Sequence, residues 1–511
     1  MTALGSDFSD AIEKSVTVHP DGEEKSLVAT DLLQQSTNLK FDLPSDAITN
    51  SAHVELKLYP NLVSHVWESV EAILQRPHGC GEQTISSSYP SVLVLRYLKQ
   101  TKQESPLGAK AQGYLWMGYQ RLLGYQGSDG GFTYWGHGDG DIALTAYAVR
   151  FLTDASEFTE IDTEVIDRAR AWLVKQQRPD GSWPSKSWSK AEDQRQTGML
   201  TALVARSLGP GSSCNSTAKS ASPVQLALTK SLDYLERRSN EIDEPYLIAS
   251  YSLAAANACD PERPVKANNR LRELAKQSPR GAYWTLETNT PFYGWGDAGR
   301  VETTAVAVQA LAQERASRPQ ATVNDDLISS GLLFLLREKD RYGVWYSGQA
   351  TINVLNTLLM ITGAAANTND SVDVVVNNQK IDSIPLPANQ QMVSPIMIDL
   401  TSAIKAGSNI VELKRSATGS VASVQIVGTY WTPWTTTATG DANTDSSGLR
   451  LNTRCDKTDA RVMEQITCRV KVERVGSRGY GMLLAEIGLP PGADIDRASL
   501  DAAIKTNWAI D

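Results

Sequence analysis

The sequence predicts a multidomain protein of α and β structure, in which an α/α toroid is inserted into a β-sandwich and is followed by a further β-sandwich domain. At roughly 100–200 residues per domain, the 511 residues correspond to about three domains. Residues 61–364 are rich in apolar helical stretches, and one helix-and-turn unit recurs within them about every 50 residues. Both flanks instead alternate apolar and polar residues with the period of two that half-buried strands show.

The two flanks, residues 1–60 and 365–434, are expected to form one sandwich. Segments such as 53–58 and 372–376 alternate as strands, but neither flank alone has enough strands for a stable sandwich. Residues 61–364 are therefore expected to be an insertion between its two halves. The last domain, residues 435–511, has about 76 residues, which is short for a sandwich, and we expect it to be truncated.

The recurring unit of the middle segment is marked by threonines at equivalent places. Thr145 and Thr201 are 56 residues apart, and Thr304 and Thr351 are 47 apart. A turn that combines glycine with an aromatic residue precedes most copies, as in residues 180–183. A unit of this length cannot bury its faces alone, so neighbouring units must stack, and about six hairpins closed into a ring give an α/α toroid. An irregular helical domain is the alternative, and the regular spacing favours the ring.

The composition excludes two classes of partner. Lys and Arg total 49 against 58 Asp and Glu, which gives a net charge of −9 and no basic face for nucleic acid. The longest uncharged stretch, residues 342–369, is interrupted by Ser, Gln, Asn and Gly, so no membrane span is expected. The N-terminus lacks a basic segment followed by an apolar one, so the protein is cytosolic or the chain begins after its signal.

Five cysteines are present, at Cys80, Cys214, Cys259, Cys455 and Cys468. The spacings of the second with the third and of the fourth with the fifth suit disulfides, but five free thiols remain open on composition alone. No spacing resembles Cys-x-x-Cys, so no metal site is expected.

One short motif carries chemistry. Residues 79–83 read Gly-Cys-Gly-Glu-Gln and precede a helix expected from Ile85 to Leu98. In this arrangement the Cys80 thiolate can attack the side-chain amide of Gln83, expel ammonia and leave an internal thioester. A thioester is a reactive acyl donor that survives in water only while it is buried.

The other residues of the motif suit this reaction. Gly79 and Gly81 give the backbone the freedom to bring a side chain three positions on back to the cysteine, with Glu82 between them and the glutamine. A helix start at Thr84 leaves free N–H groups that would stabilise an oxyanion. The alternative is a buried core thiol on a glycine turn, which the full five-residue string makes the weaker interpretation.

The motif at 79–83, the Tyr-Pro pair at 89–90, the helix pair around 114–125 and the Asp-Gly turns resemble the thioester-containing alpha-macroglobulin and complement family. The resemblance implies that the inserted segment is the thioester domain and that the flanks are the halves of a CUB domain. It also implies that the end of the chain is the start of the C-terminal macroglobulin domain of receptor-binding type.

The family implies that proteolysis of a bait segment exposes the thioester, which then acylates a nucleophile on the protease or on a nearby surface. The upstream macroglobulin domains and the bait region are missing from this chain, so we expect it to be a fragment. The resemblance implies no cofactor, single-turnover acyl transfer rather than enzymatic turnover, and a secreted or, in a bacterium, periplasmic location. In such a compartment Cys214–Cys259 and Cys455–Cys468 are expected to be disulfides, because Cys80 is otherwise engaged.

The choice of nucleophile depends on a histidine. Complement-like members that prefer hydroxyls carry one on a loop about 110 residues after the thioester cysteine, and the matching loop here, residues 185–196, has none. No catalytic histidine is therefore expected, and direct attack favours amines such as lysine. His78 is a tempting alternative base, and His137 is expected to be a solvated loop residue.

We therefore expect a protease-trapping inhibitor of alpha-macroglobulin type, with a complement-like opsonin as the alternative. A third candidate, a terpene cyclase, matches the Gln-x-x-Asp-Gly-x-Trp string at 177–183. The acidic cluster that such an enzyme needs is incomplete at 139–141, so we interpret the string as a turn of the toroid.

The thioester also requires an apolar cover. Tyr480 and Met482 of the C-terminal domain are the first candidates, although both could be ordinary strand residues. Tyr134 and Trp135 of the toroid, or the missing upstream domains, are the alternatives.

Overall fold

The structure of the protein is a computed structural model, which divides into two units, Met1–Thr435 and Thr436–Asp511. The residues that it describes are 2–4, 6, 9–11, 18–102, 104–185, 193–209, 222–318, 326–361, 370–387, 394–416, 422–433, 449–474, 488 and 493–506. Tyr480, Met482 and Cys214 lie outside these residues.

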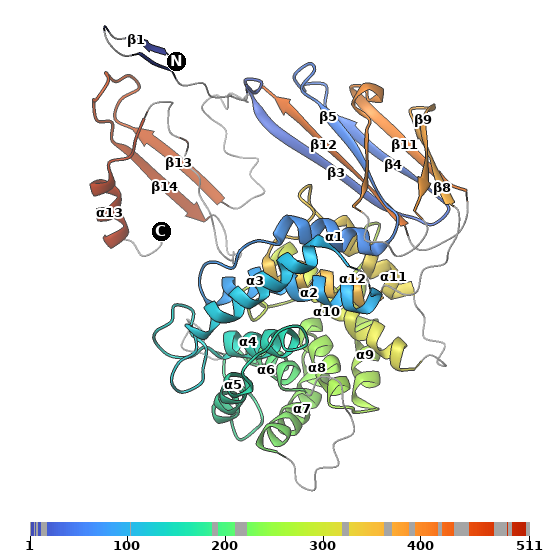
Figure 1. The fold of residues 1–511 in the computed structure, drawn as a ribbon, viewed down its shortest axis with the longest axis vertical. Helices are drawn as coiled ribbons and strands as arrows, with labels where there is room; N and C mark the ends of the chain where they lie inside the picture. Colours follow the sequence, from blue (N-terminus) through green and yellow to red (C-terminus); the bar gives the residue numbers. More distant parts are fainter. Residues whose placement is uncertain are drawn as a thin grey trace. The chain divides into compact units, whose positions relative to one another are not determined.

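Within the described ranges of the first unit, six helical hairpins form the toroid (Figure 1). The inner helices are α2 (Gly81–Thr101), α4 (Ile142–Ala155), α6 (Gln194–Leu208), α8 (Pro245–Asn257), α10 (Gly296–Ser317) and α12 (Gly348–Ile361). The outer helices are α1 (Leu62–Ile73), α3 (Pro106–Leu123), α5 (Thr163–Gln176), α7 (Pro223–Glu241), α9 (Arg263–Leu274) and α11 (Asp326–Arg337). Each inner helix packs on the next and α12 packs on α2, which closes the ring.

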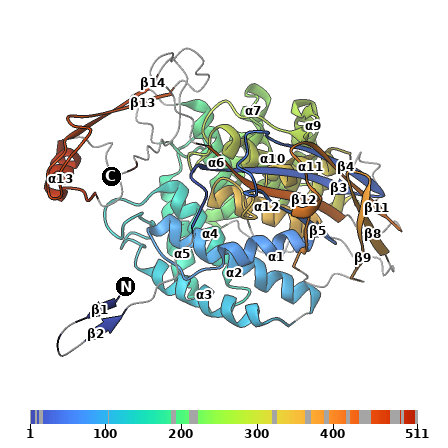
Figure 2. The same ribbon diagram turned by 90° about the horizontal axis from the view of Figure 1, so that it is seen from above.

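The inner and outer helices differ in burial as a closed ring requires. Inner helices such as α4 and α10 are buried around most of their circumference, whereas α5 and α9 bury only one stripe. The two members of a hairpin lie side by side, as Figures 1 and 2 show for α2 and α3.

The recurring threonines hold the turns of the ring. The Thr201 hydroxyl accepts a hydrogen bond from the Trp183 amide at 3.0 Å, and the Trp183 indole N–H donates to the Leu173 carbonyl of α5 at 2.7 Å. The same pattern joins Thr304 to Trp284 and Thr351 to Trp345, and Thr145 accepts from the amide of Phe132. Each buried aromatic residue thus ties an inner helix to its turn.

The glutamine and glycine of the 177–183 string also act in the turn. Gly181 has φ +94°, and a Cβ there would lie 2.3 Å from the Lys230 carbonyl. The Gln177 side-chain amide donates to the carbonyls of Gly181 at 3.0 Å and of Ala227 at 2.8 Å. The string therefore fastens one hairpin to the first turns of α7.

Two four-stranded sheets of described residues form the sandwich, in the orders β10-β5-β12-β3 and β4-β11-β8-β9. Its strands are β3 (Glu23–Leu33), β4 (Ser36–Leu43), β5 (His53–Tyr59), β8 (Asp370–Val376), β9 (Gln379–Leu386), β10 (Ile396–Asp399), β11 (Gly407–Arg415) and β12 (Ala422–Thr432). Strand β12 lies between β5 and β3, so strands from before and after the toroid alternate in one sheet (Figure 1). The assignment of this sandwich as a CUB domain stays a prediction.

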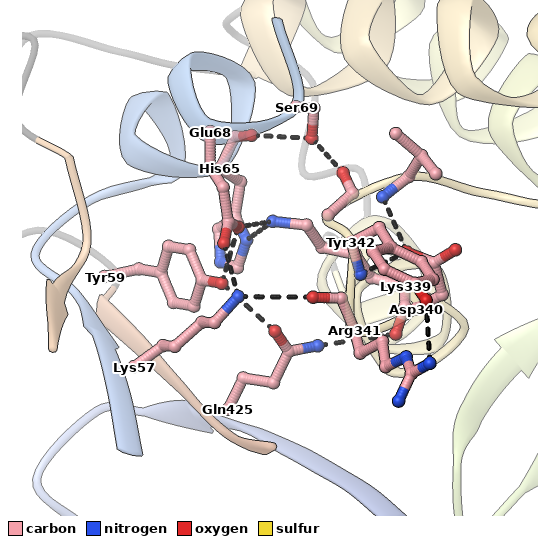
Figure 3. A network of polar contacts seen from close by, with 12 residues as sticks. Lys57, Tyr59, His65, Glu68, Ser69, Lys339, Asp340, Arg341, Tyr342 and Gln425 are labelled. Carbon is pink, nitrogen blue, oxygen red and sulfur yellow. Dashed lines mark hydrogen bonds and ion pairs between the residues drawn. The ribbon is translucent and has the colours of Figure 1, made fainter. Parts of the chain in front are cut away.

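The toroid joins the sandwich through buried polar side chains (Figure 3). Glu68 of α1 accepts hydrogen bonds from Lys339 Nζ at 2.5 Å, Lys57 Nζ at 2.7 Å and Tyr59 Oη at 2.7 Å. The phenol of Tyr59 also contacts Gln425 Oε1 on β12 at 3.1 Å. The Lys339 side chain is wholly buried, so this junction is a buried charge cluster shared by both domains.

The cluster shifts the protonation of its members. Burial raises the pKa of Glu68, but the charge of Lys339 and the hydrogen bonds from Lys339, Lys57 and Tyr59 lower it to about 2. Burial lowers the pKa of Lys339 to about 8, against the attraction of Glu68. Burial, followed by the charges of the two lysines, holds the pKa of His65 well below its usual range, so His65 is neutral beside Ser423.

The described part of the second unit contains the hairpin of β13 (Leu449–Cys455) and β14 (Cys468–Arg474), and helix α13 (Arg497–Thr506). A disulfide joins Cys455 to Cys468 at the end of that hairpin. In the first unit Cys259 is disulfide-bonded, while its predicted partner Cys214 is outside the described residues.

Three short elements complete the described part of the first unit. They are the hairpin of β1 (Thr2–Leu4) and β2 (Ser9–Ala11), the hairpin of β6 (Lys276–Ser278) and β7 (Gly281–Tyr283), and the 3-10 helix η1 (Thr401–Ala403). Of the helices that the structure describes, none combines the length and apolar character of a membrane span.

Candidate functional site

The Gly-Cys-Gly-Glu-Gln motif lies at the start of inner helix α2. The helix begins at Gly81, three residues before the predicted start at Thr84. Cys80 is the residue before the first turn, with extended backbone angles, and its carbonyl accepts from the Thr84 amide at 2.8 Å. Free N–H groups of the first turn therefore lie nearer to the cysteine than the sequence suggested.

Gln83 folds back toward Cys80. Its side-chain oxygen Oε1 accepts a hydrogen bond from the Cys80 amide at 3.1 Å. Gly79 has φ +76°, and a Cβ there would lie 1.9 Å from Gln83 Oε1 and 2.8 Å from its Cδ. Glycine is required at position 79 because the glutamine side chain occupies that space.

Gly81 is required by a different neighbour. A Cβ at Gly81 would lie 2.7 Å from the Thr133 carbonyl, and the Gly81 amide donates to the Tyr134 carbonyl at 2.8 Å. The first turn of α2 is thus pressed against the loop that follows α3.

Two side chains, one on α3 and one just after it, bind the backbone of the motif. The Gly79 carbonyl accepts hydrogen bonds from Tyr125 Oη and Arg121 Nη2, each at 2.7 Å. Arg121 Nε also donates to Thr84 Oγ1 at 3.2 Å. Nothing in the local sequence links Arg121 or Tyr125 to a motif some 40 residues earlier, so neither was predicted as a site residue.

Glu82 connects the motif to α12, the inner helix that packs on α2 where the ring closes. Its Oε1 accepts from Ser86 Oγ at 2.5 Å and from Gln349 Nε2 of α12 at 3.3 Å. Gln349 lies 267 residues further along the chain, so Glu82 ties together the first and last inner helices.

The exposure of the two predicted thioester residues differs. Cys80 is buried, with 9% of its surface exposed, whereas Gln83 is exposed. Tyr134 lies close to Cys80, and burial, followed by the charge of Asp141, raises the pKa of Tyr134 above its usual range. Trp135, one of the candidate covers, is 71% exposed, and its role as a cover stays a prediction.

A small cavity of about 80 Å³ lies at the start of α4. Asp141 and Tyr293 line it, and both also interact with the Tyr134 phenol. Ser185 and Gln196, at the two ends of the 185–196 loop, line it as well. Residues 186–192 of that loop lie outside the described residues.

Neither histidine near the site is placed as a base. His78 and His137 are exposed, and their Nδ1 atoms contact the carbonyls of Arg76 at 3.1 Å and of Trp135 at 3.0 Å. Across the described ranges, no group of three or more His, Cys, Asp or Glu residues could hold a metal ion.

Comparison with known proteins identifies relatives of this arrangement. A family model for the A-macroglobulin TED domain matches residues 53–360, more than half of the chain. Thioester-containing protein 1 allele S1 of Anopheles gambiae is 28% identical over 314 residues, which cover 59% of this chain and 22% of that protein.

Solved structures share the fold. Native alpha-2-macroglobulin of Escherichia coli, from domain MG7 to its C-terminus, matches with a TM-score of 0.54 and 15% identity over 86% of this chain and 61% of that one. Salmonella alpha-2-macroglobulin reacted with methylamine matches with a TM-score of 0.52 and 17% identity over 86% of this chain and 26% of that one. The chain therefore spans about a fifth of its curated relative and less than two thirds of these solved chains.

Proposed function

The chain belongs to the thioester-containing alpha-macroglobulin and complement family, and on this premise we propose that Cys80 and Gln83 form an internal thioester that acylates protein amines. In its formation the Cys80 thiolate attacks Gln83 Cδ, the C–S bond forms, and the amide nitrogen leaves as ammonia. In its use a lysine amine attacks the same carbon, the C–S bond breaks, and an amide bond remains with a free Cys80 thiolate. The lysines of a trapped protease are the proposed targets, which makes the whole protein an endopeptidase inhibitor.

The observation that carries the proposal is the folded-back glutamine. The hydrogen bond from the Cys80 amide to Gln83 Oε1, at 3.1 Å, brings the two reacting residues together. The glutamine side chain lies against Gly79, where a Cβ would overlap it. The same N–H group would donate to an oxyanion that develops on that oxygen.

The proposed preference for amines follows from what surrounds the site. The 185–196 loop contains no histidine, and His78 is exposed and turned to a backbone carbonyl. Tyr134 remains a neutral phenol because burial raises its pKa, so it does not serve as a base at neutral pH. Without a base, an unprotonated amine attacks a thioester faster than a hydroxyl does.

Intact-mass measurement of the purified chain tests the proposal directly. Ring closure should lower the mass by about 17 Da, and methylamine should then raise it by about 31 Da and release one free thiol. The Cys80→Ser variant should show neither change and should retain the fold, while His78→Ala should react like the wild type.

A wild-type mass equal to the plain sequence, with no methylamine adduct, would contradict the thioester. The opsonin alternative predicts ester products with glycerol in competition with methylamine, whereas the inhibitor proposal predicts amides alone. We further propose that the protein acts outside the reducing cytosol, which suits the Cys455–Cys468 disulfide.

A further inference from the structure

A second polar site lies further along the inner helices, beyond the turns that hold Cys80. Five residues after each recurring threonine, three inner helices carry Arg150, Arg206 and Gln309, and a fourth carries Asn356. Arg96 of α2 lies 54 residues before Arg150, close to one repeat. It follows Gly81 by 15 residues, which is roughly 22 Å along a helix axis.

These side chains face one cavity. Arg96, Arg150, Arg206, Gln309 and Asn356 all line a space of about 360 Å³ within the ring. The larger volume and the three guanidinium groups distinguish it from the 80 Å³ cavity at the start of α4.

Two of the three arginines have no carboxylate partner in the part of the chain that the structure describes. The carboxylate of Asp154 is taken by Arg96 at 3.1 Å and by the phenol of Tyr89. Arg206 donates to Gln309 Oε1 at 2.9 Å, and Arg150 lies 5.7 Å from the centroid of the Tyr89 ring. Both contacts are with uncharged groups.

The surrounding electrostatics leave this pair positive. Burial, and then the charge of Arg150, lower the pKa of Arg206 to about 9. Asp154, which lines the cavity and pairs with Arg96, and Glu302 also attract both arginines. Burial raises the pKa of Glu302 to about 7, so at neutral pH the two carboxyl groups offset the charge of the three arginines only in part. Asn356 Nδ2 is buried, lines the same space and has no hydrogen-bond partner among the described residues.

We propose that this cavity is a binding site for a phosphate group, held by Arg150 and Arg206 and completed by the amide donor of Asn356. The amide of Gln309 donates to the Asn353 carbonyl and to the Thr357 hydroxyl, so Gln309 orients Arg206 rather than binding the ligand. Paired guanidinium groups match the oxygens of a phosphate, and such charge-assisted hydrogen bonds are the strong ones in proteins. The cavity is larger than inorganic phosphate needs, so the preferred ligand is a phosphate monoester of a small molecule.

Isothermal titration of the full chain tests the site. Inorganic phosphate and glucose 6-phosphate are titrated at constant ionic strength, with chloride as the blank. We expect one equivalent of each to bind, with the monoester tighter, and Arg150→Gln and Arg206→Gln to weaken both by about tenfold or more.

Two further variants keep the test decisive. Arg150→Lys preserves the charge if the glutamine variant fails to fold, and should weaken binding less than full removal. Arg270→Gln removes an exposed arginine that is paired with Asp243 and Glu273, and should bind like the wild type.

Absence of binding to the wild type, or equal affinity in all variants, would overturn the proposal. The three arginines would then act only on the negative C-terminal ends of the inner helices, near which they lie. Stronger binding of inorganic phosphate than of the monoester would reject the larger ligand and retain the anion site.

Discussion

The Cys80 site and the junction between toroid and sandwich are both held together by polar side chains, but the partners of those side chains differ. At the Cys80 site the main contacts are with backbone carbonyls and amides, to which Tyr125, Arg121 and Gln83 bind. At the junction the contacts are between charged side chains, with Glu68 between two lysines. Loss of one group should therefore alter reactivity at the first region and pH-dependent stability at the second.

The largest expected effect is at Gly79. Gly79→Ala should prevent thioester formation, because the new methyl group would overlap Gln83 Oε1. The measurement is the methylamine adduct by intact mass. Gly138→Ala is the matched control, since Gly138 also has positive φ, at +86°, but a Cβ there would meet no atom within 4 Å, so this variant should keep the adduct. Loss of the adduct in both variants would attribute the effect to backbone strain alone.

Removal of the Glu68 charge at the junction between toroid and sandwich should have the next largest effect. Glu68→Gln leaves Lys339 buried without its counter-charge and should lower the free energy of unfolding by about 3–5 kcal/mol. Chemical denaturation of the full chain measures it, with Glu412→Gln on the exposed face of β11 as the control. If the two variants differed little in stability, the junction network would not hold the domains together.

The same network predicts the pH dependence of stability. The pKa of Glu68 falls from 4.5 to about 2 on folding, so its contribution is complete above about pH 5 and is lost as the pH falls toward 2. Lys339 has the reverse sense, since its pKa falls from 10.5 to about 8, and stability should rise between pH 8 and 10 as the buried amine becomes neutral.

Denaturation of wild type and Glu68→Gln across pH 3–10 checks both slopes. The loss of unfolding free energy between neutral and acid pH should be smaller by about 2–3 kcal/mol in the variant, because the titration of Glu68 accounts for that part of the loss. An unchanged acid slope would assign it to other carboxyl groups.

The smallest expected effect concerns the hydrogen bond by which a recurring threonine of an inner helix holds the turn before it. Thr201→Val removes the acceptor of the buried Trp183 amide and should cost about 1–3 kcal/mol. Thr303→Val is the matched control, because Thr303 Oγ1 is buried with no hydrogen-bond partner in the described residues, and should be neutral or stabilising. Equal losses would mean that the threonine hydroxyl is not what holds the turn.

Some features followed from local sequence alone. The recurring threonine and the Gly-aromatic turns predicted stacked hairpins, because each signal concerns one helix and the turn before it. Gly79 was predicted to be needed for its backbone freedom, and its φ of +76° lies in the region that favours glycine. The start of α2 was predicted three residues late, because Cys80 precedes the first turn where the sequence suggested only a loop.

Other features were decided by the closure of the ring. Sequence reasoning could name Cys80 and Gln83, since they are three residues apart, but not Gln349, which reaches Glu82 only because α12 packs on α2. Lys339 reads as an ordinary surface lysine until the strands of the sandwich bury it against Glu68. Period and composition determine which face of a segment is apolar, whereas the partners of a polar side chain depend on which distant segments the closed fold brings to it.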